Sequence, residues 1–214
     1  IETLQVPLSD QAAVEIEANG WASLWQETKE YTQRVFDNVQ ALQALLPNAI
    51  VVATGSFPVG TGLGADAISP RAFNRLSLQA LVALATLFMA FERKGDWCDV
   101  LDLVLIVLLP KSAEGFRPIG VFPTAIRLWM RSRYGLAKAW QATHSLPITF
   151  GGAGKSAQYA AWQAALTAEC AALEHLEHVQ GLIDLVKAFE MVPHAILARF
   201  AAARGFPIAL IRLS

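Results

Sequence analysis

The stretch that decides the fold is Gly181-Leu-Ile-Asp-Leu-Val-Lys-Ala-Phe-Glu-Met-Val192. Residues 181–186 predict a short strand with a carboxylate, Asp184, among its apolar side chains. An ionised and unpaired carboxylate is costly to bury, so Asp184 is expected to meet a cation or to lie at an open strand end. Pro193 then predicts the start of a helix that ends at Gly205. This unit is typical of a divalent-cation site, with a plain capping or turn role for Asp184 as the alternative.

The composition predicts a folded protein with a locally basic segment. The chain has 214 residues, of which 54% are hydrophobic and 16% charged, so it is not a disordered tail. Its net charge of −1 argues against a uniformly basic nucleic-acid binder. A basic segment nevertheless carries Lys111, Arg117, Arg127, Arg131, Arg133 and Lys138 against Glu114. Such a segment is either the electrostatic footprint of a polyanion or a solvated helix face.

The cysteines and the longest apolar run indicate in which cellular compartment the protein is expected. Cys98 and Cys170 stand in no metal-ligand spacing and predict small buried side chains in a reducing, intracellular compartment, nuclear or cytoplasmic. The uncharged run 76–91 is shorter than the roughly 20 residues that span a bilayer, so no membrane partner is expected. The chain begins with Ile1 and ends within an apolar run, and we therefore expect a fragment of a longer protein.

Two segments before residue 100 carry clear local signals. The glycine-rich segment 61–68 predicts a loop, after which Asp66 or Ser69 is expected to cap the next element. Apolar residues over 78–91 predict a helix that Gly95 ends. Because this helix is apolar nearly all round, it is expected to be enclosed by other elements.

Residues 103–120 predict a β-hairpin. The apolar run 103–109 is expected to form a buried strand, residues 112–116 a turn, and residues 117–120 a second extended run. Lys111 and Arg117 would lie near the bend. Two cations close together suit a triphosphate, with two solvated loop cations as the alternative.

The segment Phe150-Gly-Gly-Ala-Gly-Lys-Ser156 is similar to the end of a phosphate-binding P-loop. That pattern needs glycine five positions before Gly154, where Thr149 stands, and the residues just before it make a poor central strand. A P-loop nucleotide-binding protein therefore remains only an alternative.

Several segments together resemble one family. Asp184-Leu-Val-Lys-Ala-Phe189, followed by Val192-Pro193-His194, closely resembles the first catalytic palm motif of reverse transcriptases encoded by non-LTR retrotransposons and group II introns. Thr61 to Ile68 resembles the Pro-Gly-x-Asp-Gly-Ile box of these enzymes, with Ala67 in place of the usual second glycine. Leu109-Pro-Lys111 with Arg117-Pro-Ile119 looks like their fingers hairpin, and residues 150–156 resemble their Gly-Phe-x-x-Gly-Arg-Ser/Thr segment.

The resemblance implies an α+β fold that is helix-rich, with an antiparallel β-hairpin and a palm strand. It implies a helical N-terminal extension at 1–60, a fingers subdomain at 61–178 and the start of a truncated palm at 179–214. The activity implied is that of an RNA-directed DNA polymerase using two Mg²⁺ ions, an RNA template, a DNA primer and a dNTP. The oligomeric state is not predicted.

The same resemblance implies roles for single residues. Asp184 would be catalytic and bridge both metal ions, the backbone carbonyl of Leu185 would help to hold one of them, and Phe189 would be the steric gate against a 2′-hydroxyl. Lys111 and Arg117 would bind the triphosphate. The residues expected to contact nucleic acid are Arg127, Arg131, Arg133 and Lys155.

The family needs more than this chain contains. Its enzymes have a further aspartate pair in a Tyr/Phe-Ala-Asp-Asp hairpin, a primer grip and a thumb, so we expect no polymerisation by this segment alone. A non-catalytic nucleic-acid-binding relic of such a polymerase is a further alternative.

Overall fold

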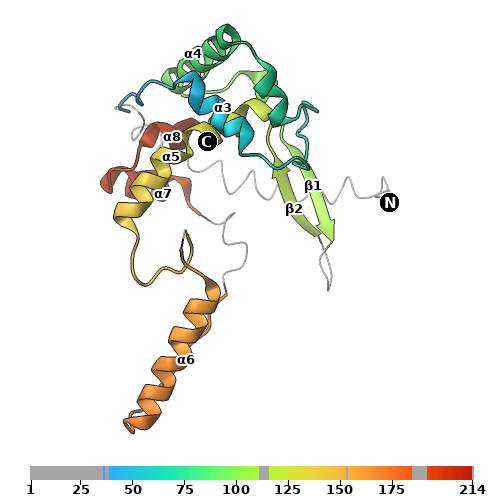
Figure 1. Cartoon of the computed structure of the whole chain (residues 1–214). Coiled ribbons are helices and arrows are strands. Elements are labelled where there is room, and N and C mark those ends of the chain that lie inside the picture. Colours follow the sequence, from blue (N-terminus) through green and yellow to red (C-terminus); the bar gives the residue numbers. More distant parts are fainter. Residues whose placement is uncertain (1–35, 37–38, 111–115, 153, 185–191, 214) are drawn as a thin grey trace. The chain divides into compact units, whose positions relative to one another are not determined.

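The structure is a computed structural model, and it describes residues 36, 39–110, 116–152, 154–184 and 192–213. The helices and strands are shown in Figure 1: α3 (Pro47–Gly55), η2 (Pro70–Arg75), α4 (Leu78–Lys94), η3 (Asp99–Leu101), β1 (Leu105–Pro110), β2 (Phe116–Val121), α5 (Thr124–His144), α6 (Ala157–Leu173), α7 (His194–Ala203) and α8 (Ile208–Leu213). The chain divides into two compact units. The first unit is Ile1–Lys138 with Val192–Ser214, and the second is Ala139–Met191.

The sheet of the described residues is a two-stranded antiparallel hairpin. Strands β1 and β2 lie side by side, with a register that runs from Leu105 opposite Val121 to Pro110 opposite Phe116 (Figure 1). The bend between them, 111–115, lies outside the described residues. At this level the prediction of a helix-rich α+β chain with an antiparallel hairpin is confirmed.

Helix α4 begins and ends where its sequence signals predict. The Ser77 hydroxyl accepts a hydrogen bond from the Ala80 N–H at 3.3 Å, which caps the N-terminus. Gly95 has a φ of 76° and donates its N–H to the Phe91 carbonyl at 2.7 Å, which ends the helix. The face that α4 buries consists of Leu81, Ala85, Phe88 and Glu92. Leu78, Val82 and Leu87 are exposed, so the prediction that α4 is enclosed on all sides is wrong for the described structure.

The core of the first unit is centred on Trp97. Its ring meets Phe88 at a centroid distance of 6.3 Å and Trp129 of α5 at 5.4 Å, both edge to face. The indole N–H donates to the Leu213 carbonyl at 2.7 Å. Arg212 of α8 donates to the Lys94 carbonyl at 2.8 Å and so satisfies one of the last carbonyls of α4. These contacts attach the final helix of the chain to the end of α4.

The second unit contains α6, which begins at a capped N-terminus but buries no residue. The Ser156 hydroxyl accepts a hydrogen bond from the Tyr159 N–H at 3.1 Å. Beyond α6, residues 181–184 adopt no regular secondary structure, and 185–191 lie outside the described residues. The predicted palm strand is therefore absent over 181–184, the part of it that the structure describes. No described strand pairs with this segment, and an isolated strand has no partner for its backbone hydrogen bonds.

Two further expectations concern the surface. Cys98 and Cys170 are both exposed and free, so the prediction that they are buried is wrong. None of the described helices combines the length and the apolar character needed to cross a membrane.

Candidate nucleic-acid interface

The residues of the expected polymerase site are only partly described. Asp184 is exposed and belongs to the second unit. Lys111, Leu185 and Phe189 lie outside the described residues. For Arg117 the structure describes the backbone, which pairs with Leu109 in the hairpin. The roles of Lys111, Arg117 and Asp184 in one polymerase site therefore stay a prediction.

The described residues do not supply a complete metal site. Among them, no group of three or more His, Cys, Asp or Glu side chains is placed to hold a metal ion. Two Mg²⁺ ions need several oxygen ligands, of which Asp184 would provide a single carboxylate.

Arg133 is a buried structural residue, which corrects its assignment to a nucleic-acid contact. Its side chain is 4% exposed and forms a two-pronged ion pair with Glu92, with Nε to Oε1 at 2.7 Å and Nη2 to Oε2 at 2.6 Å. Arg133 also donates to the Gln43 carbonyl at 2.9 Å, and the Trp129 indole donates to Glu92 at 2.7 Å. With its guanidinium engaged in this way, Arg133 has no access to a phosphate.

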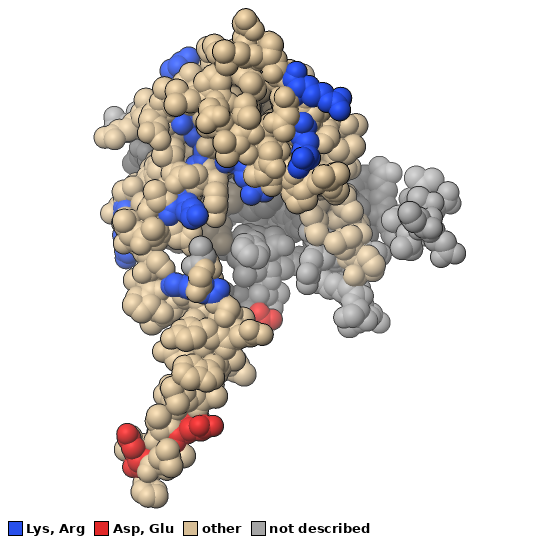
Figure 2. All heavy atoms as spheres, viewed as in Figure 1, with Lys and Arg blue, Asp and Glu red and all other residues tan. Residues whose placement is uncertain are grey.

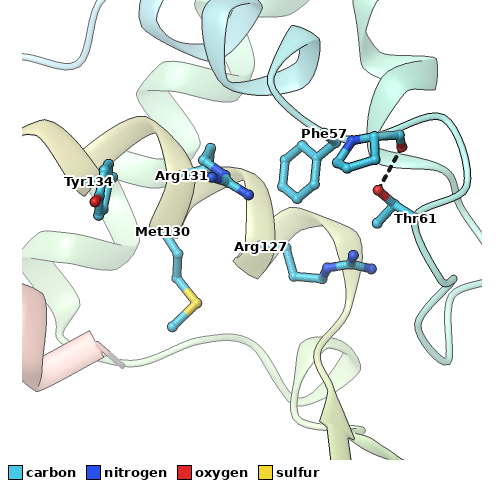
Figure 3. Close-up of a pocket in the computed structure, with 7 residues that line it drawn as sticks. Phe57, Thr61, Arg127, Met130, Arg131 and Tyr134 are labelled. Atoms are coloured by element: carbon cyan, nitrogen blue, oxygen red, sulfur yellow. Dashed lines mark hydrogen bonds between the residues drawn. The ribbon is translucent and has the colours of Figure 1, made fainter. Parts of the chain in front are cut away.

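Arg127 and Arg131 do reach the surface, on the side of α5 that faces Phe57 (Figure 3). The guanidinium carbon of Arg131 lies 4.9 Å from the centre of the Phe57 ring, and that of Arg127 lies 5.6 Å from it. Arg127 also donates to the Gly62 carbonyl at 2.7 Å. The two arginines line an open pocket of about 410 Å³, which Phe57, Met130 and Tyr134 also line. These two of the four predicted contact residues are thus brought together.

The predicted glycine-aspartate loop positions the start of α5. The Asp66 carboxylate accepts a hydrogen bond from the Thr124 N–H at 2.6 Å, and the Thr124 hydroxyl donates to the Ile68 carbonyl at 2.6 Å. A carboxylate at this helix N-terminus is favourable. Asp66 therefore caps α5, whereas the predicted cap on the next element is not made, since Ser69 forms no side-chain cap on η2. Gly64 lets the 61–68 loop lie close to the backbone before α5, because a Cβ on residue 64 would be only 2.6 Å from the Phe122 carbonyl oxygen.

Lys155 closes a local loop in the second unit. Its ammonium donates to the Leu146 carbonyl at 2.7 Å and to the Thr149 hydroxyl at 3.1 Å. Residues 145–150 contain no strand, and the Ser156 hydroxyl is already used as the cap of α6. A P-loop needs a strand before its glycines, so the structure does not favour that alternative. The contact of Lys155 with nucleic acid stays a prediction.

The charged side chains are unevenly distributed. On the face shown in Figure 2, Lys and Arg lie at several separate places over the first unit. Acidic side chains gather near the end of α6 in the second unit. A continuous basic stripe is thus not seen on this face, and the basic character is local, as at Arg127 and Arg131.

Sequence reasoning missed Phe57 and Tyr134. Tyr134 follows Arg127 by two helical turns, so helical spacing places both on one side of α5 and was a usable signal. Phe57 had no such signal, because it meets the arginines through a contact between segments far apart in the chain.

A scan against protein-family models gives no match for this chain, and neither does a search of curated proteins.

Proposed function

We propose that this chain supplies the fingers and the first palm motif of an RNA-directed DNA polymerase, a reverse transcriptase of the non-LTR retrotransposon type. The observation that carries the proposal is the order of the motifs. The glycine-aspartate box, the hairpin with Lys111 and Arg117, the Gly-Lys-Ser segment and the Asp184 motif follow one another as they do in that family.

The hairpin supports the proposed binding of a triphosphate. Lys111 directly follows Pro110, the last residue of β1, and Arg117 pairs with Leu109 near the start of β2. Both cations therefore belong to the same end of the hairpin. A point charge and a planar guanidinium close together suit the phosphates of an incoming dNTP.

The reaction proposed is nucleotidyl transfer to a DNA primer on an RNA template, carried out by the full-length protein. Asp184 would contribute one carboxylate to the metal site, and the remaining carboxylates would come from a further palm segment. When bound, Mg²⁺ ions would supply the electrostatic stabilisation on which phosphoryl transfer depends. Phe189 would lie beneath the sugar and exclude a 2′-hydroxyl, which selects deoxynucleotides.

A second candidate is a nucleic-acid-binding relic of such a polymerase that no longer catalyses. The observation that favours it is the environment of Asp184, which is exposed and has no assembled metal-ligand group around it in the described part of the chain. In this case Arg127 and Arg131 would still bind nucleic acid, and DNA synthesis would be absent.

Sugar selectivity during RNA-templated primer extension tests the proposed function. The protein used is this chain joined to the palm and thumb sequence that a polymerase requires, with kcat/KM measured for a dNTP and for the matching ribonucleotide. Phe189→Ala should raise the relative use of the ribonucleotide, because the discrimination is steric. Phe200→Ala is the matched control, since Phe200 is an exposed ring on α7 and should leave the ratio unchanged.

Two results would count against the proposal. The first is primer extension whose sugar selectivity does not respond to Phe189→Ala. The second is a Phe189→Ala protein that simply unfolds, which would make Phe189 a core residue. Failure of the intact protein to extend any primer, with RNA binding retained, would favour the non-catalytic candidate.

A further inference from the structure

The pocket beside α5 combines fixed positive charge with an accessible apolar wall. Its volume of about 410 Å³ falls within the range of small-ligand sites. Figure 3 shows Arg127 and Arg131 on α5 beside the Phe57 ring, whereas Met130 and Tyr134 lie on α5 farther from that ring. Among the described residues that line the pocket, none is acidic. The pocket therefore suits an anionic ligand that also has an apolar surface.

The two guanidinium groups are held in place before any ligand binds. Phe57 is 6% exposed, so its ring is a fixed platform, and both guanidiniums lie over it at cation–π distance. Arg127 is further fixed by its bond to the Gly62 carbonyl. Neither Arg127 nor Arg131 takes part in the ion pairs Lys94–Asp96 and Arg133–Glu92 of the described residues. Preorganised guanidiniums of this kind lose little freedom when they bind a phosphate.

The apolar wall comes from the same helix. Met130 is 39% exposed and Tyr134 is 53% exposed, and both line the pocket. Tyr134 lies one turn after Met130 and Arg131, so the ring follows the charges along α5. An exposed tyrosine ring offers a surface on which any nucleobase stacks.

We infer that this pocket seats one unstacked nucleotide of a single strand of nucleic acid. The phosphate binds Arg127 and Arg131, and the base packs on Met130 and Tyr134. The inference rests on the proposed function for its choice of nucleic acid, and it adds a defined site and a requirement for single strands. A duplex cannot use the apolar wall, because its bases are already stacked and paired. A phosphopeptide fits less well, because the exposed ring of Tyr134 offers a surface on which a nucleobase stacks.

Binding to a short oligonucleotide tests the inference with the 214-residue chain itself. The measurement is fluorescence anisotropy with a labelled ten-nucleotide oligothymidylate, compared with a ten-base-pair duplex at the same salt. Tyr134→Ala should weaken single-strand binding about tenfold, whereas Tyr134→Phe should bind normally because it keeps the ring. Arg131→Lys keeps the charge but loses the planar fork, and it should also weaken binding several-fold. Arg93→Lys is the matched control, because Arg93 is exposed on α4 outside the pocket.

The inference is overturned if Tyr134→Ala and Arg131→Lys bind the strand as Arg93→Lys does. It is also overturned if the duplex binds as tightly as the single strand, or if a phosphopeptide competes better than the oligonucleotide. None of these measurements depends on Asp184 or on DNA synthesis. A protein that binds through the pocket but whose full-length form never extends a primer would leave this inference standing and remove the proposed polymerase activity.

Discussion

Helices α4 and α6 have the same length and the same kind of start, yet they differ completely in burial. Each has 17 residues, and each begins after a serine whose hydroxyl accepts a hydrogen bond from the helix. Helix α4 buries four residues, among them Phe88, which has no exposed surface. Helix α6 buries none, and its Trp162 is 60% exposed. Local signals thus determine where a helix forms, but burial depends on the elements that pack against it.

The packing of α4 against other helices explains why it buries residues and α6 does not. This helix packs against α3 and α8, and its Glu92 pairs with Arg133 of α5. Its buried residues recur every three or four positions, so one face is turned to the core. The first unit therefore holds the scaffold that fixes the loop at 61–68, α5 and the pocket beside α5.

The difference in burial between α4 and α6 predicts the largest loss of stability for a substitution of Phe88. Phe88→Ala should lower the free energy of unfolding by about 4 kcal/mol, because it removes a buried ring and leaves a cavity. Trp162→Ala is the matched change on α6 and should alter that free energy by less than about 0.5 kcal/mol. Urea titrations followed by far-ultraviolet circular dichroism measure both. A large decrease in the free energy of unfolding for Trp162→Ala would show that α6 is packed in solution. The difference in burial between α4 and α6 would then be wrong.

The next effect concerns the ion pair between α4 and α5. Arg133→Met should destabilise the protein by about 3 kcal/mol, because it leaves the Glu92 carboxylate buried without its partner. Combining it with Glu92→Gln should recover part of this loss, since no buried charge then remains. Arg93→Met, at an exposed position on α4, is the control and should have little effect. Equal stability of Arg133→Met and Arg93→Met, measured by urea unfolding, would contradict a buried pair.

The smallest effect tests the end of α4. Gly95→Ala should cost about 1–2 kcal/mol, because alanine is strained at a φ of 76° and its Cβ would overlap the Arg212 side chain. Gly135→Ala should act in the opposite direction, by roughly 0.5–1 kcal/mol, because Gly135 lies inside α5 with open space around it. Thermal unfolding of the two variants should therefore shift to opposite sides of the wild type. Shifts in the same direction would disprove the conformation assigned to Gly95.

The parts of the fold that sequence predicts are those with local causes. Ser77 and Gly95 mark the ends of α4 through contacts within a few residues, and the hairpin follows from two extended runs close together. The cap on α5 has no local cause, because Asp66 bonds to Thr124, 58 residues later in the chain. The strand predicted at 181–184 did not form for a similar reason. A strand needs a partner strand, and the residues next to it in the sequence do not identify that partner.

The candidate site follows the same rule. Arg127 and Arg131 could be singled out from the basic segment, and the structure places them together. Arg133 belongs to the same segment but follows the buried Trp129 by one turn, so helical spacing indicates the buried side. Its partner Glu92 lies 41 residues earlier, and no pattern near Arg133 identifies it. Charge alone therefore could not separate the structural arginine from the two at the surface.

The most direct test of the proposed function is RNA-templated DNA synthesis by this chain, joined to the palm and thumb sequence that a polymerase requires, with Asp184→Asn. This change keeps the size of the side chain and removes the negative charge that would hold the metal ions. The account predicts synthesis by the wild type and a loss of at least about a thousandfold in rate in Asp184→Asn, with folding unchanged by circular dichroism. Asp99→Asn, at an exposed position in η3, should remain as active as the wild type. An Asp184→Asn protein that synthesises DNA at the rate of Asp99→Asn would contradict the central claim.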